Sequence, residues 1–420
     1  MLDLKWIREN PDLVRKGLAA KASPFDLNGL LQLDSQRRSL LKEVEDLKAL
    51  RNSANDEIAT FKKSGQKEAA EAKIASLKSS SQKIKEIDDK VGELSIKIDT
   101  IAYTIPNIPH ESVPVAVGAS GNQVVRSWGE PRKLANPKDH LEVGKDWVSM
   151  NWGSRITGAG FPVYKGFGAK LERALLNFMI DLHATRHGYV EVWPPALVNR
   201  TSMTGTGQLP KFEDDMYRLK DEDYFLVPTA EVPVTNLLRE ETLEEKDLPI
   251  KFVAYSPCFR REAGSYGKDT KGLSRVHQFD KVEMVKFVKP EDSLNELETL
   301  VKNAEEVLQA LELPYRVLLL GSGDTSFSAA KCYDLEVWAP ASQKWFEVSS
   351  CSTFGDFQAR RMNIRFRRAT TQKLEYVHTL NGSGVALART VLCLLENFQF
   401  TGDNPDQFPK ALRPYLKPLL

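Results

Sequence analysis

The chain has 420 residues and a mass of 47.3 kDa, which is longer than one hydrophobic core usually supports, so we expect two domains. Lys and Arg number 58 against 57 Asp and Glu, and this net charge of +1 excludes a global basic field as the basis of nucleic-acid binding. The four cysteines, Cys258, Cys332, Cys351 and Cys393, form no CxxC pair, so the composition favours reduced thiols and no structural zinc.

The first segment, MLDLKWIRENPDLV, carries charges where a signal peptide needs an apolar core. No run of about eighteen apolar residues occurs in the sequence, so no membrane-spanning helix is predicted. We therefore expect a cytoplasmic protein that does not bind a membrane.

Two apolar seams with the three-and-four spacing of a coiled coil follow, separated by a helix stop at Lys62-Lys63-Ser64-Gly65. The first seam comprises Leu33, Leu40, Val44, Leu47, Ala54, Ile58 and Phe61, and the second comprises Ala70, Ile74, Leu77, Ile84, Ile87, Val91, Leu94, Ile98 and Ile101. Two helices joined by a glycine turn predict an antiparallel hairpin, each arm about 50 Å long at about 1.5 Å per residue.

Periodicity alone leaves two interpretations of this hairpin. It is either a dimerisation or spacer coiled coil, or a rigid arm whose exposed lysines lie along an RNA backbone. Acidic side chains nearly balance basic ones over residues 1–105, so composition does not mark an RNA binder. Geometry permits RNA binding without requiring it.

The segment TIPNIPHESVPVAVGASGN, residues 104–122, is rich in proline and glycine and predicts the end of the second helix at Ile105. We place the domain boundary there. The predicted organisation is an N-terminal domain at 1–105, a linker at 106–122 and a second domain at 123–420.

The second domain has the pattern of an α+β fold. A helix-like stretch over 168–187 precedes strand-like runs at 188–198, 224–232, 250–259, 277–288, 333–340 and 344–354. Their short spacing predicts a mainly antiparallel sheet flanked by helices. Neither GxGxxG nor GxxxxGK with Ser or Thr follows a strand, so any nucleotide site uses neither a Rossmann turn nor a P-loop.

The stretch FRREAGSYGKDTKGLSRVHQFDKVE, residues 259–283, predicts a hairpin with a long tip, whose returning strand begins at Arg275. Alternation on that strand places Phe279, Lys281 and Glu283 on one face, with a ring, a cation and a carboxylate. Two interpretations remain from charge alone: an exposed, salt-bridged loop, or arginines that hold a polyphosphate.

Near the C-terminus, LNGSGVALARTVLCLLE predicts a strand, a glycine turn and an apolar helix that contains Arg389. An arginine in an apolar helix is costly unless it meets a partner, and by itself the pattern favours a buried structural ion pair. By itself EVSSCS, residues 347–352, favours an edge strand with a serine-rich turn.

Together these segments resemble a known family. The FRxE strand with its returning strand and the later arginine helix resemble motifs 2 and 3 of class II aminoacyl-tRNA synthetases, and GYVEVWPPALV, with Gly188 and Pro195, is similar to motif 1. TAEVP, YDLEVW, EVSSCS, DFQARR and LNGSG narrow the resemblance to the seryl-tRNA synthetase family, whose tRNA-binding arm the hairpin resembles. The resemblance covers essentially the whole chain.

The resemblance implies a catalytic set of Arg260, Glu262, Arg275, Glu347 and Arg389. Arg260 would bridge the serine carboxylate and the ATP α-phosphate, which a planar, permanently charged fork can do. Glu262 would orient the nucleotide, Arg275 would hold the outer phosphates, and Phe279 and Arg389 would cover the two faces of adenine. The implied ATP-binding set is Arg260, Arg261, Glu262, Arg275, Val276, Phe279, Glu347, Val348, Ser349, Ser350 and Arg389.

Serine recognition and magnesium binding are also implied by the resemblance. The serine-binding set is Thr229 and Glu231 for the ammonium, Arg260 for the carboxylate, and Glu283, Asn381 and Ser383 for the hydroxyl. Glu347 and Ser350 would bind the Mg²⁺ that accompanies ATP. No general base is required, because the serine carboxylate itself attacks the α-phosphorus, so His183, His187 and His277 are expected to be structural.

The implied enzyme is a serine–tRNA ligase of the bacterial kind that forms seryl-adenylate from ATP and L-serine and then charges tRNA(Ser), and tRNA(Sec) where present. Motif 1 implies a homodimer. Two alternatives remain: a ligase that loads a carrier protein, whose known examples lack the long arm, and a coiled-coil adaptor without activity.

Overall fold

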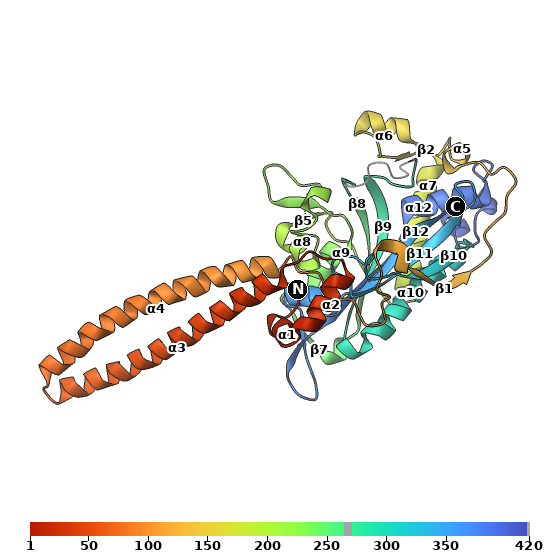
Figure 1. Ribbon diagram of the computed structural model, residues 1–420. Coiled ribbons are helices and arrows are strands. Elements are labelled where there is room, and N and C mark those ends of the chain that lie inside the picture. Colours follow the sequence, from red (N-terminus) through yellow and green to blue (C-terminus); the bar gives the residue numbers. More distant parts are fainter. Residues whose placement is uncertain (264–270, 418–420) are drawn as a thin grey trace. The chain divides into compact units, whose positions relative to one another are not determined.

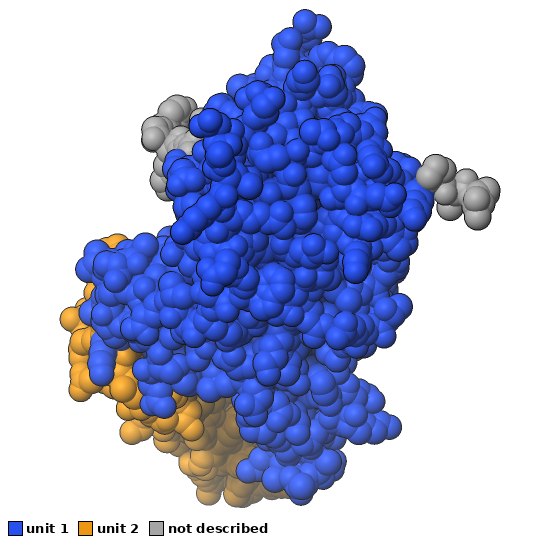
Figure 2. All heavy atoms as spheres, turned by 90° about the vertical axis from the view of Figure 1, so that its right-hand side faces the viewer, with its two compact units in different colours: residues 1–2, 16–23, 106–420 blue, residues 3–15, 24–105 orange. Residues whose placement is uncertain are grey.

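The computed structural model describes residues 1–263 and 271–417, with Ser79 described by its backbone alone (Figure 1). The chain divides into two compact units, which are coloured separately in Figure 2. Unit 1 comprises residues 1–2, 16–23 and 106–420, and unit 2 comprises residues 3–15 and 24–105. No helix among the described residues has the length and apolar character needed to cross a membrane.

Unit 2 is built on two long helices, α3 (Leu27–Lys63) and α4 (Lys67–Ala102), which lie side by side along their length (Figure 1). Asp26 caps α3 by accepting a hydrogen bond from the Gly29 N–H. After Ser64 the chain turns at Gly65, whose φ of +74° is one that glycine adopts without strain. The predicted stop is therefore confirmed, while the second helix ends at Ala102, three residues before the predicted position.

The two seams pack against each other as predicted. Val44, Ile84 and Ile87 are buried between the helices. Opposite charges flank them, with Lys48 Nζ 3.0 Å from Asp88 and Lys83 Nζ 2.8 Å from Glu43. These exposed pairs contribute little stability, but they are consistent with the antiparallel alignment that the apolar seams set. Ile74 departs from the prediction because it remains 44% exposed.

Unit 1 contains an eight-stranded sheet in the order β1-β10-β11-β12-β15-β9-β8-β4. Every neighbouring pair is antiparallel except β4 and β8, so the predicted α+β class is confirmed. The strands are β1 (Gln123–Trp128), β4 (Val190–Val192), β8 (Ile250–Phe259), β9 (Gln278–Val288), β10 (Tyr315–Leu319), β11 (Lys331–Ala339), β12 (Lys344–Thr353) and β15 (His378–Ala386).

Helices cover both faces of this sheet. One face carries the main core, in which Val282, Met284 and Leu380 pack with apolar side chains of α7 (Phe167–Thr185), α10 (Ser293–Ala310) and α12 (Leu387–Phe398). The other face is partly covered by α9 (Glu231–Thr235) and α11 (Phe357–Met362), against which Val285 and Phe287 pack. The remainder of that second face is available for a pocket.

Shorter elements complete the two units. The helices are α1 (Leu4–Glu9), α2 (Pro11–Ala20), α5 (His140–Val143), α6 (Met150–Ile156), α8 (Arg200–Thr206) and α13 (Arg413–Leu416), and the strands are β2 (Val148–Ser149), β3 (Val163–Tyr164), β5 (Leu197–Asn199), β6 (Tyr224–Leu226), β7 (Thr242–Glu244), β13 (Arg365–Arg367) and β14 (Leu374–Tyr376). Residues 106–122 belong to unit 1, where the Asn107 N–H donates to Phe327 O and the Ser322 N–H donates to Pro114 O.

Several predicted strand limits are wrong. The run at 188–198 is two short strands, because Pro194 and Pro195 cannot donate ladder hydrogen bonds. The run at 224–232 ends as a strand at Leu226, and its TAEV portion enters α9. Strand β9 begins at Gln278 rather than Arg275, and the hairpin tip at 264–270 lies outside the described residues.

The predicted glycine turn before Arg389 is also wrong, because β15 continues through both glycines. A Cβ on Gly382 would lie 2.7 Å from Cys351 Sγ, and one on Gly384 would lie 2.6 Å from His183 Nε2. These glycines therefore serve close packing of the strand against its neighbours rather than a reversal of the chain.

Candidate active site

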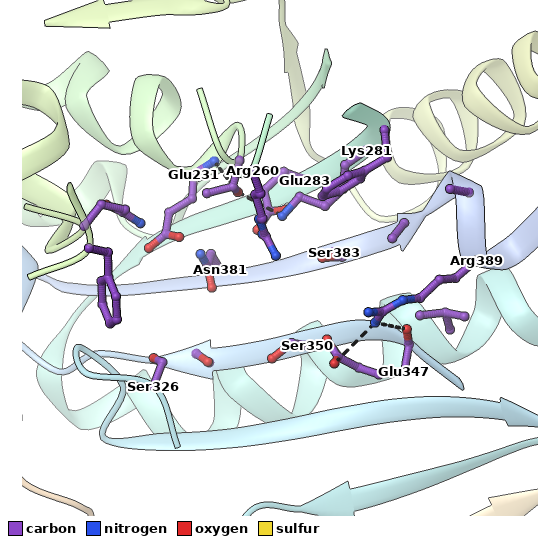
Figure 3. Close-up of a pocket in the computed structure, with 18 of the residues that line it drawn as sticks. Glu231, Arg260, Lys281, Glu283, Ser326, Glu347, Ser350, Asn381, Ser383 and Arg389 are labelled. Carbon is purple, nitrogen blue, oxygen red and sulfur yellow. Dashed lines mark hydrogen bonds and ion pairs between the residues drawn. The ribbon is translucent and has the colours of Figure 1, made fainter. Parts of the chain in front are cut away.

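A pocket of about 350 Å³ lies on the second face of the sheet. Strands β9, β12 and β15 form its floor, and the first turn of α12 and several loops form its walls. Figure 3 shows Glu231, Arg260 and Glu283 over this floor, with Arg389 reaching toward Glu347. Of the predicted site residues the pocket lining includes Thr229, Glu231, Arg260, Glu262, Arg275, Val276, Phe279, Glu283, Glu347, Val348, Ser350, Asn381, Ser383 and Arg389.

Two predicted ATP-binding residues lie outside this lining. The Arg261 side chain is exposed and donates from Nη1 to Asp214 O at 3.0 Å. The Ser349 side chain is buried and donates from Oγ to Ser383 O at 2.6 Å. Because its hydroxyl already bonds to β15, only the backbone of Ser349 is placed to serve a ligand.

Strand alternation explains how β9 and β15 supply the floor. Phe279, Lys281 and Glu283 share one face of β9, as predicted, and all three line the pocket. Ser383 lies directly opposite Glu283 in the ladder, and Asn381 precedes it by two residues on the same face. This register brings a carboxylate, an amide and a hydroxyl together at one end of the pocket.

A β-bulge explains how Glu347 and Ser350 both face the pocket, although they are three positions apart in the strand. Glu336 of β11 pairs with Glu347 and Leu335 pairs with Ser349, so Val348 is an extra residue in β12. The extra residue reverses the alternation of side chains. Ordinary alternation would have placed Glu347 and Ser350 on opposite faces.

The end of the pocket near α9 is acidic and held by a hydrogen-bond network. Buried Glu231 accepts a 2.7 Å bond from Gln358 Nε2, and Gln358 is itself oriented by a 2.7 Å bond that Thr379 Oγ1 donates to its Oε1. Burial, and then the nearby Glu283 carboxylate, raise the pKa of Glu231 to about 7. Glu231 is therefore neutral below this pH and ionised above it.

Lys281 lies between the acidic residues of this end. Its ammonium donates to Thr229 Oγ1 at 2.9 Å and lies 2.7 Å from Glu283 Oε2. The contact with Glu283 is an ion pair, and because a carboxylate oxygen has two lone pairs, Oε2 retains acceptor capacity beside the ammonium. Thr229 Oγ1 also accepts from the Glu231 N–H at 3.1 Å, so both of its lone pairs are occupied.

Arginines form the middle of the pocket. Arg260 Nε donates to Pro228 O at 3.2 Å, and its guanidinium carbon lies 5.3 Å from the centroid of the Phe279 ring. Arg275 pairs with Glu262, whose φ of +52° is a strained value for a residue with a side chain. The ring of His277 helps to hold the backbone of Arg260 in place, because its Nδ1 lies 3.0 Å from Arg260 O.

The far end contains Arg389, which lies in the first turn of α12 rather than inside its apolar body. Its guanidinium donates to Ser274 O at 3.1 Å and to Glu347 O at 2.8 Å, and lies 3.4 Å from the Glu347 carboxylate. The side chain is 27% exposed. The interpretation of Arg389 as half of a buried structural ion pair is therefore wrong, because its pair with Glu347 is partly exposed and lines the pocket.

The corner around Glu347 has the donors that a magnesium ion prefers. Ser350 and Asp334 lie opposite each other on β12 and β11. Burial, and then the Glu347 carboxylate, raise the pKa of Asp334 well above its ordinary value. Carboxylate and hydroxyl oxygens suit a hard divalent cation, whose charge would relieve this repulsion.

The opposite wall is a loop that sequence reasoning missed. Ser326, Phe327 and Ser328 line the pocket, although nothing in the sequence around them signals a site. Lys21 Nζ donates to Ser326 O at 2.7 Å, and Asn107 Nδ2 donates to Ser328 O at 2.8 Å. Residues more than two hundred positions earlier in the chain thus hold this wall, which no local pattern could indicate.

Comparison with known proteins identifies both parts of the chain. The family model described as "tRNA synthetase class II core domain (G, H, P, S and T)" matches residues 211–398, which include all three floor strands of the pocket. The family model described as "Seryl-tRNA synthetase N-terminal domain" matches residues 1–109. Residues 211–398 therefore form the core domain of a class II aminoacyl-tRNA synthetase.

Individual relatives are similar over nearly the whole chain. A serine–tRNA ligase of Trichlorobacter lovleyi is 55% identical, over 99% of this chain and 98% of its own length. One from Desulfitobacterium hafniense is 54% identical over 99% of each chain. The crystal structure of seryl-tRNA synthetase from Pyrococcus horikoshii complexed with ATP has a TM-score of 0.92 and 37% identity, over 99% of this chain and 98% of that one. The chain belongs to the seryl-tRNA synthetase family, and the predicted enzyme class, serine–tRNA ligase, is confirmed.

Proposed function

We propose that the chain joins L-serine to ATP as seryl-adenylate, releasing pyrophosphate, and then transfers serine to the terminal ribose of tRNA(Ser). One observation carries the residue assignment: a single pocket joins a small acidic end, with hydroxyl and amide groups, to a longer stretch that contains three arginines. The acidic end fits an amino acid, and the arginines fit a polyphosphate with its base.

Serine would occupy the acidic end. The ionised Glu231 carboxylate would bind the ammonium, and Thr229 would join it if its hydroxyl released Lys281. Asn381, Ser383 and Glu283 would read the hydroxyl, because they meet across the β9–β15 ladder. A pocket built to pair with that hydroxyl rejects alanine by leaving buried polar groups unpaired.

ATP would occupy the rest of the pocket. Arg260 lies between the two ends, where it would hold the serine carboxylate close to the α-phosphate. Adenine would lie between Phe279 and Arg389, whose guanidinium is already held in place by Ser274 O and Glu347 O. Arg275 would bind the outer phosphates after exchanging its bond to Glu262 for them.

Glu347 and Ser350 would hold the Mg²⁺ that accompanies ATP, and Asp334 lies beside them. Bound there, the cation would neutralise phosphate charge. The chain's own contribution is alignment and charge: the serine carboxylate oxygen attacks the α-phosphorus and pyrophosphate leaves, while the arginines stabilise the phosphate oxygens.

The helical hairpin α3–α4 would bind the long extra arm of tRNA(Ser), and of tRNA(Sec) where present, by shape and backbone contacts. A homodimer is supported by exposed apolar side chains at the β4 edge of the sheet, where Trp193 is 72% exposed and Val190 is 59% exposed. A cytoplasmic location is part of the same proposal, because charging of tRNA takes place there.

Charging of a tRNA(Ser) transcript with radiolabelled serine, ATP and magnesium tests the proposal, with a transcript whose extra arm is shortened as the matched control. We expect charging of the full transcript and little charging of the shortened one. Activation of serine without charging of either transcript would instead support a ligase that loads a carrier protein. Neither activation nor charging by a folded protein would support the adaptor.

A further inference from the structure

The buried Lys281 has no assigned part in the reaction, although its ammonium lies among the residues proposed to read serine. The side chain is only 8% exposed, and the ammonium contacts Thr229 and Glu283. Burying a lysine is costly unless its charge is used, and the charge here lies against a carboxylate that is 2% exposed. The pair therefore keeps two buried charges side by side within the pocket (Figure 3).

The charge of Lys281 decides what Glu283 offers to a ligand. An ionised carboxylate only accepts hydrogen bonds, whereas a protonated one can also donate. Apart from the Lys281 ammonium, Glu283 Oε2 meets no hydrogen-bond donor among the described residues, so an ionised Glu283 leaves a lone pair for a donor on the ligand. The side chain of serine has such a donor and that of alanine has none.

The other groups around Glu283 would not keep it ionised without Lys281. Glu231 on α9 is a second carboxylate, whose pKa the Glu283 carboxylate helps to raise, so it supplies no positive charge. The thiols of Cys258 and Cys351, whose pKa values burial raises to about 11 and about 12, stay neutral near neutral pH. Arg260 is the remaining cation, and its guanidinium is directed to Pro228 O and the Phe279 ring. Lys281, Glu231, Arg260 and Cys258 thus lie on the same side of the sheet as Glu283, whereas Cys351 belongs to the core on the other face.

We propose that Lys281 is a specificity-determining positioning residue: it holds Glu283 ionised, so that the pocket demands a hydrogen-bond donor on the amino-acid side chain. This inference rests on the proposed function, because it assigns the demand to the end of the pocket that reads serine. It goes beyond that function in placing the discrimination against alanine in a residue that need not touch the substrate.

The preference for serine over alanine isolates this effect. Both amino acids carry the ammonium that Glu231 would bind, so the titration of Glu231 cancels in their ratio. Only serine has the hydroxyl that Glu283 would read. The quantity to measure is the inhibition constant of alanine against serine-dependent pyrophosphate exchange, divided by the KM of serine, from about pH 6 to about pH 9.

Lys281→Met removes the charge at similar length, and Lys281→Gln also removes it but keeps a donor for Thr229. We expect the serine preference of both variants to be about 10- to 100-fold lower than that of the wild type near the acid end of the range, as for loss of a charged acceptor. Part of the preference should return near the alkaline end. Lys281→Arg, which keeps the charge, should keep a preference that does not vary with pH even if its rate falls.

A double-variant cycle makes the mechanism specific. Glu283→Gln should lower the serine preference at every pH. Adding Lys281→Met to it should lower the preference no further, because the negative charge on residue 283 that Lys281 stabilises is already absent. Additive losses would overturn the inference. Equal weakening of serine and alanine in the neutral variants would also overturn it, since this would leave Lys281 only a structural role.

The remaining outcomes are equally decisive. If neither neutral variant folds, Glu283→Gln alone decides: an unchanged serine preference in that variant overturns the inference. A wild-type protein that shows no serine-dependent exchange would overturn the proposed function, and the inference with it. Serine-dependent exchange with a preference that Lys281→Met leaves intact would overturn the inference alone.

Discussion

Gln358 offers a quantitative test of how the pocket controls the charge of Glu231. Gln358 is 1% exposed and donates both to Glu231 Oε1 at 2.7 Å and to Thr206 O at 3.1 Å. Gln358→Leu removes both of these bonds, and also the bond that Thr379 Oγ1 donates to Gln358, with little change of volume. The main consequence should be electrostatic, because the bond from Gln358 is one of the interactions that lower the pKa of Glu231 against burial.

The magnitude follows from the strength of that bond. A hydrogen bond to a charged group contributes about 1.5–3 kcal/mol, which corresponds to a rise of about one to two pH units in the pKa of Glu231. From a starting pKa of about 7, the ionised fraction at neutral pH then falls about 5- to 50-fold. Because only the ionised carboxylate binds the serine ammonium, we expect KM for serine to rise by the same factor.

The assay is serine-dependent pyrophosphate exchange over a range of pH, with serine and ATP titrated separately. The increase in serine KM should shrink as pH rises and Glu231 ionises, while ATP KM should stay unchanged. Thr379→Val is the matched control, because it removes the bond to Gln358 Oε1 but leaves the bond to Glu231 in place. An increase in serine KM that is the same at every pH, or equal in the two variants, would refute the reasoning.

Three further predictions concern other parts of the chain. Arg389→Ala should raise ATP KM by about 10- to 100-fold, because it removes the positively charged guanidinium that would stack on adenine. A fully active variant would refute the stacking role. Replacing Leu33–Ile101 by a short splice should spare pyrophosphate exchange and abolish charging of tRNA, and unchanged charging would make the hairpin a spacer. Gly382→Ala should lower the free energy of unfolding by about 1–3 kcal/mol, because the new Cβ would lie 2.7 Å from Cys351 Sγ; thermal denaturation that matches wild type would contradict this packing account.

Local periodicity was sufficient to predict the features that depend on it. The seams around Val44 and Ile84 were predicted because a helix repeats its contacts every three to four residues. The shared face of Phe279, Lys281 and Glu283 followed from the two-residue repeat of a strand. In both cases the neighbours in space are set by neighbours in sequence.

Features that depend on distant contacts could not be predicted in this way. The glycine at 382 suggests a turn in sequence, and only its closeness to Cys351 explains why it lies within a strand. The bulge at Val348 depends on the pairing of β12 with β11. The part played by Gln358 depends on α11 lying beside Glu231, so DFQARR signalled family membership without indicating a role for its glutamine.

Pyrophosphate exchange into ATP, measured with the purified protein, magnesium and each amino acid in turn, tests most directly whether this pocket activates serine. It requires no RNA, so it separates the pocket from the hairpin. If the pocket activates serine, exchange will depend on serine and will be far weaker with alanine. Exchange that is equally strong with alanine, or no exchange with any amino acid from a folded protein, would contradict it.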